Sequence, residues 1–100
     1  MTDEIVVTRG AGERKYEARK AGHLAGFVQY VEHGDAIRFT HTETLPDFRG
    51  QGVGEALASY SLADAVARDL RIVPLCPYIA RYLRKNPIPG AVVDWPEDPA

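Results

Sequence analysis

The alternation of hydrophobic and polar positions predicts four β-strands in the first half of the chain. We expect them over residues 5–9, 14–19, 23–31 and 37–44, separated by turns that contain glycine. The fourth strand has the cleanest alternation, in which Ile37, Phe39 and His41 share one face. His41 is therefore expected to point toward the apolar side of the sheet.

The period of the pattern changes from two to about 3.6 at Gly52, which predicts a helix. Its predicted buried stripe consists of Val53, Ala56, Leu57, Tyr60, Ala63, Ala67 and Leu70. A fifth strand is expected over residues 72–76, and a second helix from Pro77 to the residues before Pro87. The predicted order β-β-β-β-α-β-α is that of an α/β protein with a mixed sheet.

The length of 100 residues fits one domain, which we expect over residues 1–86. Residues 87–100 then form a proline-rich tail. Within it, Trp95 and the apolar residues 91–93 are expected to dock on the body of the domain. The pattern leaves both a monomer and a homodimer open.

Charge and cysteine content exclude several classes of function. The chain has 12 basic and 14 acidic residues, a balance that lacks the positive excess of nucleic-acid-binding proteins. Cys76 is the only cysteine, so neither an intrachain disulfide nor a cysteine-rich metal site can form, and no metal site is expected. An acidic start and the lack of about 20 consecutive apolar residues predict a cytoplasmic protein with no membrane span.

The segment 49–54 joins the fourth strand to the first helix and contains three alternate glycines. Bare backbone can approach a ligand there, and the first N–H groups of the helix lack partners within the helix. Such a junction favours an anion such as pyrophosphate. The sequence matches neither a P-loop nor the dinucleotide fingerprint, since no Lys-Ser or Lys-Thr pair follows and Glu55 stands where the third glycine belongs. A simple tight turn is the alternative.

The same segment resembles the coenzyme A pyrophosphate loop of the GNAT acetyltransferase superfamily, Gln/Arg-x-x-Gly-x-Gly/Ala. Residues 39–43 and 74–78 are similar to a narrower group of unusually small, single-domain GNAT-like proteins. The resemblance covers residues 5–86. It implies an open mixed sheet that holds acetyl-CoA, the cosubstrate, between the splayed ends of the fourth and fifth strands.

The resemblance also implies which residues bind the coenzyme. The backbone of Thr44 and Leu45 is expected to meet the pantetheine arm. The resemblance places six residues around the pyrophosphate: Arg49, Gly50, Gln51, Gly52, Val53 and Gly54. Arg84 and Lys85 are either partners for the outer phosphate or simply the solvated face of the second helix.

Cys76 and His41 are the candidate catalytic residues. Cys76 directly precedes the second helix, where unpaired N–H groups favour a thiolate and an acetyl relay through sulfur. His41, on a neighbouring strand, is then a candidate base toward Cys76 or an incoming ammonium. The alternatives are a buried inert cysteine and a hydrogen-bonded core histidine. Many GNAT enzymes use a tyrosine acid on this helix, but Leu83 stands at that place here, with Tyr82 and Tyr78 nearby.

The acceptor side is expected to be open, because only residues 10–13 separate the first two strands, where GNAT enzymes for small amines place helices. This favours a peptide or protein amine, and Glu43 and Asp47 would suit a cationic acceptor. We therefore expect an acetyl-CoA-dependent N-acetyltransferase. The alternative is a CoA-binding module with little or no transfer that acts through partner contacts.

Overall fold

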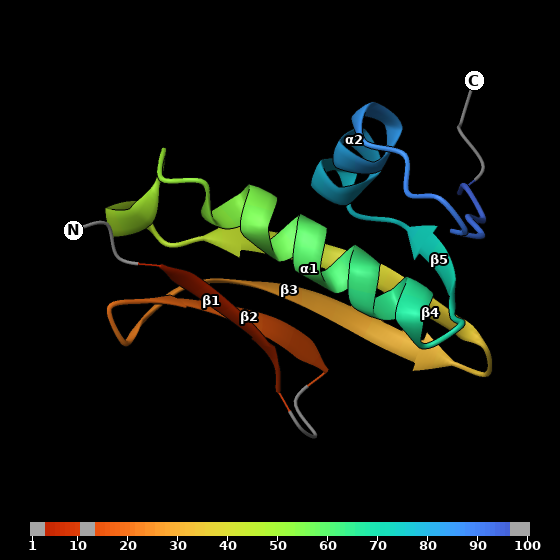
Figure 1. Ribbon diagram of the computed structural model, residues 1–100, viewed down its shortest axis with the longest axis horizontal. Helices are drawn as coiled ribbons and strands as arrows, with labels where there is room; N and C mark the ends of the chain where they lie inside the picture. Colours follow the sequence, from red (N-terminus) through yellow and green to blue (C-terminus); the bar gives the residue numbers. More distant parts are fainter. Residues whose placement is uncertain (1–3, 11–13, 97–100) are drawn as a thin grey trace.

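A computed structural model describes residues 4–10 and 14–96 of the chain. It has two layers, a five-stranded sheet and two helices that cover one face of it (Figure 1). In chain order the elements are β1 (Ile5–Arg9), β2 (Lys15–Lys20), β3 (His23–His33), β4 (Ala36–Thr44), the short 3-10 helix η1 (Pro46–Phe48), α1 (Val53–Ala67), β5 (Arg71–Pro74) and α2 (Pro77–Lys85). The predicted order of elements is confirmed.

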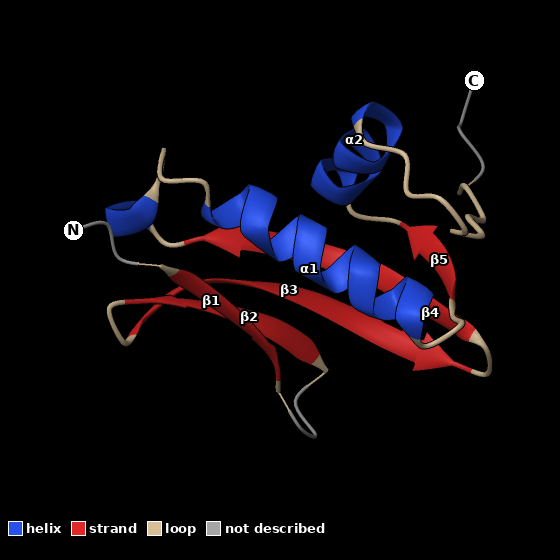
Figure 2. Ribbon diagram, in the orientation of Figure 1, coloured by secondary structure: helices blue, strands red, loops and turns tan. Residues whose placement is uncertain are grey.

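The strands lie in the sheet in the order in which they occur in the chain. Strands β1 to β4 form an antiparallel meander, whereas β5 runs parallel to β4 after the crossover through α1. Helices α1 and α2 lie on the same face (Figure 2). The predicted mixed sheet is confirmed, and the element bounds differ from the predicted ones by no more than three residues. The predicted turn between the first two strands lies partly outside the described residues.

A β-bulge interrupts the pairing of β3 with β4. Gln29 lies opposite His41 and the next residue, Tyr30, lies opposite Phe39, so that Thr40 is an extra residue on β4. One extra residue shifts the alternation of side chains by one position in the rest of the strand.

The bulge changes which side chains of β4 face the helices. Before it, Ile37 and Phe39 are fully buried; after it, Thr42 and Thr44 are half-buried and His41 is exposed. The expectation that His41 points toward the apolar side is therefore wrong. Regular alternation of inward and outward side chains does not hold past Thr40, because β4 gains a residue there.

Helix α1 buries a different stripe from the predicted one. It begins after Gly52, and its buried residues are Val53, Leu57, Ala58, Ser61, Leu62 and Ala65. Three members of the predicted stripe, Tyr60, Ala63 and Ala67, are exposed. Alanine and serine occur on all sides of this helix, so its sequence is compatible with more than one buried stripe. Leu57 and Leu62 determine which side packs on the sheet.

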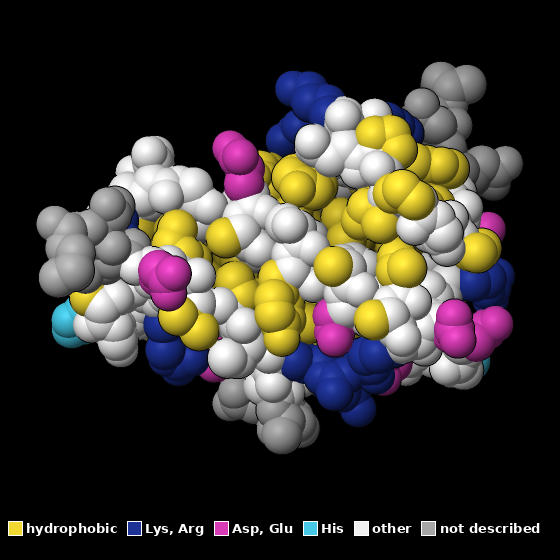
Figure 3. Space-filling model, in the orientation of Figure 1, with side chains coloured by type: hydrophobic (Ala, Val, Ile, Leu, Met, Phe, Trp, Pro, Cys, Tyr) yellow, Lys and Arg dark blue, Asp and Glu magenta, His cyan; other side chains and the backbone are white. Residues whose placement is uncertain are grey.

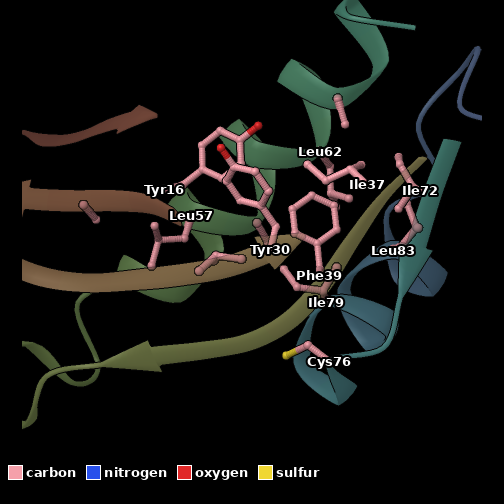
Figure 4. Packing of buried hydrophobic residues seen from close by; sticks show 14 of the residues in the cluster. Tyr16, Tyr30, Ile37, Phe39, Leu57, Leu62, Ile72, Cys76, Ile79 and Leu83 are labelled. Atoms are coloured by element: carbon pink, nitrogen blue, oxygen red, sulfur yellow. The ribbon is translucent and has the colours of Figure 1, made fainter. Parts of the chain in front are cut away.

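The core lies between the sheet and the two helices. Figure 4 shows Phe39 at its centre, with Tyr16 and Tyr30 on one side and the α2 residues Ile79 and Leu83 on the other. The rings of Tyr16 and Tyr30 pack with centroids 5.1 Å apart. This core attaches both helices to the sheet and thereby fixes where the N-terminal ends of α1 and α2 lie.

The chain after α2 returns along the outer edge of β5. The N–H of Ile72 donates to the carbonyl of Val92 (2.9 Å), and the N–H of Asp94 donates to the carbonyl of Ile72 (2.8 Å). Val93 forms a parallel bridge with Ile72, and Nη1 of Arg71 donates to Oδ2 of Asp94 at 2.8 Å. Of the tail expected over residues 87–100, residues 97–100 lie outside the described residues.

The hydroxyl of Tyr16 joins the sheet to α1. It donates to Oδ2 of Asp64 at 2.7 Å, and guanidinium groups of Arg9 and Arg68 lie 3.8 Å from the same oxygen. Burial of the ring and the hydrogen bond to the Asp64 carboxylate raise the pKa of Tyr16 above its usual value.

Replacing Tyr16 with Phe should lower the free energy of unfolding by about 1–2 kcal/mol at neutral pH, because a partly buried charge-assisted hydrogen bond is lost. The folded state holds the Tyr16 proton more tightly than the unfolded state does. Wild-type stability should therefore persist below the ordinary tyrosine pKa of 10.0 and decline as the pH rises beyond it. Urea unfolding at neutral and alkaline pH measures both effects. The control is Tyr60→Phe, at an exposed tyrosine, which should lose as much stability at alkaline pH as the wild type does. An equally large alkaline loss of stability in Tyr16→Phe would contradict this prediction.

Candidate active site

The parallel strands β4 and β5 pair only over their first four residues. The register ends at Phe39 opposite Pro74, and one further hydrogen bond links the N–H of Cys76 to the carbonyl of Phe39 (2.8 Å). The chain then turns into α2 at Pro77, whereas β4 continues to Thr44. The last part of β4 therefore has a partner on the β3 side only.

The free edge of β4 presents the main chain of Thr42 and Thr44. The N–H of Leu45 donates to the carbonyl of Ala25 in β3 at 2.8 Å. Because main-chain groups alternate along a strand, those of Thr44 and Thr42 point away from β3, toward the side on which β5 has diverged. Thr44 also lines the pocket described next.

The main-chain groups of Leu45 are not free in this way. Its N–H is bonded to Ala25 and its carbonyl accepts from the N–H of Phe48 at 2.9 Å. Leu45 instead lines a separate pocket with His23 and Leu24. Of the two residues expected to meet the pantetheine arm, Leu45 thus has its main-chain groups bonded within the protein, to β3 and η1, and Thr44 is the one at the free edge.

The glycine segment forms a pocket of about 320 Å³ at the N-terminal end of α1. Gly50 and Gly52 have φ values of +77° and +83°, in the left-handed region, and a Cβ atom at either would meet nothing within 4 Å. Gly52 is the N-cap of α1 and provides no side chain to cap it. The first N–H groups of the helix are thus left for an external acceptor.

The other predicted residues of the segment divide into two groups. Arg49 and Gly54 line this pocket, as does Val53, whose side chain is buried. The amide of Gln51 instead supports the loop: its Oε1 accepts from Lys20 Nζ at 2.6 Å and its Nε2 donates to the carbonyl of Asp47 at 3.1 Å.

Tyr78, in the first turn of α2, reaches across to the first turn of α1. A Cβ atom at Gly54 would lie 2.7 Å from the Tyr78 hydroxyl oxygen, so only glycine allows this approach. Burial and the nearby Glu55 carboxylate raise the pKa of Tyr78 above its usual value. The hydroxyl is therefore protonated at neutral pH and is available as a donor in the pocket.

A second pocket of about 360 Å³ continues from Glu55 and Tyr78 along α2. It is lined by Arg81 and Lys85, one helical turn apart. Arg84 lies elsewhere, with its guanidinium 4.7 Å from the centroid of the Trp95 ring. Figure 3 shows basic side chains gathered over α2 on this face. The sequence reasoning missed Arg81, although its spacing of four residues from Lys85 was a usable signal.

Cys76 lies at the point where β4 and β5 diverge. It is the N-cap of α2 and its side chain is 4% exposed. Its sulfur lies 3.3 Å from Oγ1 of Thr42, a side chain that the bulge has turned to this face. Thr42, which the sequence reasoning did not single out, thus contacts the candidate nucleophile.

His41 lies on the opposite face of β4. Its Nε2 is 3.3 Å from Oε1 of Glu43, and its ring packs near Phe27 with centroids 6.1 Å apart. The structure therefore does not bring His41 and Cys76 together. Within residues 4–10 and 14–96, no three His, Cys, Asp or Glu side chains are grouped so as to hold a metal ion, and no helix is long and apolar enough to cross a membrane.

A protein-family model described as GCN5-related N-acetyltransferase matches residues 15–90. The chain belongs to the GCN5-related N-acetyltransferase family. Curated members of comparable length include Protein NATD1 of Xenopus tropicalis, 39% identical over 90 residues that cover 88% of this chain and 83% of that protein. Protein NATD1 of Homo sapiens is 39% identical over 87 residues, covering 85% of this chain and 77% of its own.

Solved structures of the family share the fold. The solution structure of a GCN5-like putative N-acetyltransferase from Staphylococcus aureus superimposes with a TM-score of 0.68 at 22% identity, covering 92% of this chain and 90% of that one. The ribosomal-protein-alanine N-acetyltransferase from Brucella melitensis gives 0.53 at 22% identity, with coverages of 85% and 52%. The chain is thus an N-acetyltransferase domain, of a family that uses acetyl-CoA.

The contact between Gly54 and Tyr78 can be tested by adding one methyl group. Gly54→Ala should lower the free energy of unfolding by about 1–3 kcal/mol, since the new Cβ overlaps the Tyr78 hydroxyl. Combining it with Tyr78→Phe should recover part of that loss, because the atom at 2.7 Å is removed. Urea unfolding of the four proteins measures this coupling. Additive effects of the two substitutions would contradict the contact.

Proposed function

We propose that this chain binds acetyl-CoA between the diverging ends of β4 and β5 and transfers the acetyl group to a primary amine of a peptide or protein. The observation that carries the proposal is the convergence of two sets of free main-chain groups. The unpaired edge at Thr42 and Thr44 and the uncapped N-terminus of α1 border the same space.

The residues present fit the coenzyme in three respects. The open space over Gly50 and Gly52 leaves room for a pyrophosphate beside the positive end of α1. Thr42 and Thr44 offer strand-like hydrogen bonds to the amides of a pantetheine arm. Arg81 and Lys85, farther along the same groove, offer positive charge to an outer phosphate. The acyl group would then lie near Cys76, where the two strands part.

A peptide or protein acceptor is supported by the uncovered face of the sheet. β1 pairs directly with β2, and no helix among the described residues covers the face opposite α1 and α2. A small amine would find no enclosing walls there, whereas an extended chain end can lie on an open sheet. The exposed carboxylate of Glu43, on this face, suits an approaching ammonium.

The finer proposal concerns the route of the acetyl group. In a relay through Cys76, the thiolate attacks the thioester carbon, the bond to the coenzyme sulfur breaks, and that sulfur takes a proton. The amine then attacks the carbonyl carbon of acetyl-Cys76, its proton passes to water, and the carbon–sulfur bond breaks to release the Cys76 thiolate. Two features support this route: the hydroxyl of Thr42 lies 3.3 Å from the sulfur, and Cys76 lies at the start of α2. Tyr78 offers a proton to the departing coenzyme sulfur from the neighbouring wall.

Binding of acetyl-CoA without transfer is the second candidate function. It is favoured by one observation, the separation of His41 from Cys76 by the thickness of the sheet. Without that pair, the described residues place no histidine against the sulfur. The protein would then act through contacts with partner molecules.

Gly52→Arg should abolish acetyl-CoA binding, since a side chain would enter the space proposed for the pyrophosphate. Isothermal titration calorimetry with acetyl-CoA measures this. Gly22→Arg is the matched control, because Gly22 has almost the same φ (+81°) and equally open surroundings but lies in the turn between β2 and β3. Both variants carry similar backbone strain, so only Gly52→Arg should lose affinity. Equal affinities would show that the coenzyme binds elsewhere, and absence of binding by wild type would refute both functions.

The relay predicts a covalent intermediate. After incubation with acetyl-CoA and no acceptor, intact-mass measurement should show one added acetyl group on the wild-type chain. The adduct should be absent from Cys76→Ser and released by hydroxylamine, which cleaves thioesters but not amides. Transfer to peptide amines by Cys76→Ser at the wild-type rate would exclude the relay and leave direct transfer.

A further inference from the structure

A groove of about 440 Å³ opens on the uncovered face of the sheet, on the pair of strands that later diverge. It is lined by Ala36 and Arg38 of β4, Arg71 and Val73 of β5, and then by Leu75, Asp94, Trp95 and Pro96. Arg38 and Val73 are register partners, so their side chains project from the same face. The groove follows β5 toward Leu75, which is followed in the chain by Cys76.

The groove combines exposed apolar walls with the cationic side chain of Arg38. Leu75 is 47% exposed and Trp95 43% exposed, and the guanidinium of Arg84 lies against the Trp95 ring and holds it in place. Arg71 is neutralised by Asp94 at 2.8 Å and Asp35 at 3.2 Å. Arg38 is exposed, lines the groove and forms no ion pair with any described residue.

We propose that this groove binds the acceptor as an extended peptide segment that carries an acidic side chain to Arg38 and an apolar side chain to Leu75 and Trp95. The proposal rests on the proposed transfer to a peptide or protein amine and adds the class of sequence that is recognised. A segment that lies along the groove from Arg38 past Leu75 has one end at the point where β4 and β5 part, at which the acyl group is proposed to lie.

The spacing of residues along β4 indicates which position of the bound peptide carries the acidic side chain. Arg38 and His41 are three residues apart on the same strand, a separation of about 7–10 Å. Glu43 and His41 form the exposed pair nearest to the free end of β4. If the ammonium lies beside this pair, an extended peptide brings its third or fourth residue opposite Arg38.

The single tryptophan of the chain provides a readout that does not depend on catalysis. Because Trp95 lines the groove, binding of a peptide should change its emission. The probe is a short peptide with a free N-terminus, Glu at the third position and Leu beside it, compared with the same peptide carrying Gln in place of Glu. We expect about tenfold tighter binding of the Glu peptide by the wild-type chain.

Arg38→Gln should abolish that preference, and Arg19→Gln, a substitution of another exposed arginine two strands away on β2, should retain it. Leu75→Ala should weaken binding of both peptides by the same factor. The ratio of kcat/KM for the two peptides, measured with acetyl-CoA, should follow the binding ratio.

The outcomes separate this proposal from the proposed function. Binding that depends on Arg38, with no acetylation of any amine, would support the groove and refute transfer. Acetylation of both peptides at equal kcat/KM, with no change in Trp95 emission, would refute the groove and leave transfer intact. Retention of the preference for Glu by Arg38→Gln would also overturn the groove proposal.

Discussion

The short pairing of β4 with β5 is the constraint on which the arrangement of the site depends. The N–H of Leu75 turns back to the carbonyl of Val73, the N–H of Cys76 makes the last bond to Phe39, and Pro77 then starts a helix. The two strands separate at that point because the chain leaves the ladder to form α2. An edge of β4 is left open, and the start of α2 is brought beside the start of α1.

The bulge at Thr40 gives the two faces of β4 different properties. Thr42 is turned toward the helices and meets Cys76, whereas His41 and Glu43 are turned to the uncovered face. One inserted residue therefore assigns a hydroxyl to the side of the glycine segment and an imidazole–carboxylate pair to the other side. A strand with regular alternation would have exchanged these groups.

The order of elements and the glycine segment could be predicted from sequence because each depends on local signals. The alternation in β4, the prolines at 74 and 77, and the glycines at 50, 52 and 54 act within a few residues of chain. The side of the sheet on which His41 lies depends on pairing with β3, and the main-chain bonds of Leu45 depend on β3 and η1. Those partners are distant in sequence. The buried stripe of α1 was mispredicted for a different reason. Its many alanines and serines differ little in hydrophobicity, so the sequence does not mark one side of the helix clearly.

The return of residues 92–94 along β5 has a consequence for how the molecule meets others. An outermost strand normally offers unpaired N–H and C=O groups that can recruit a strand from another chain. Here both main-chain groups of Ile72 are already bonded to the C-terminal segment. Residues 92–94 therefore occupy the main-chain groups at this border of the sheet, while the groove beside it stays exposed.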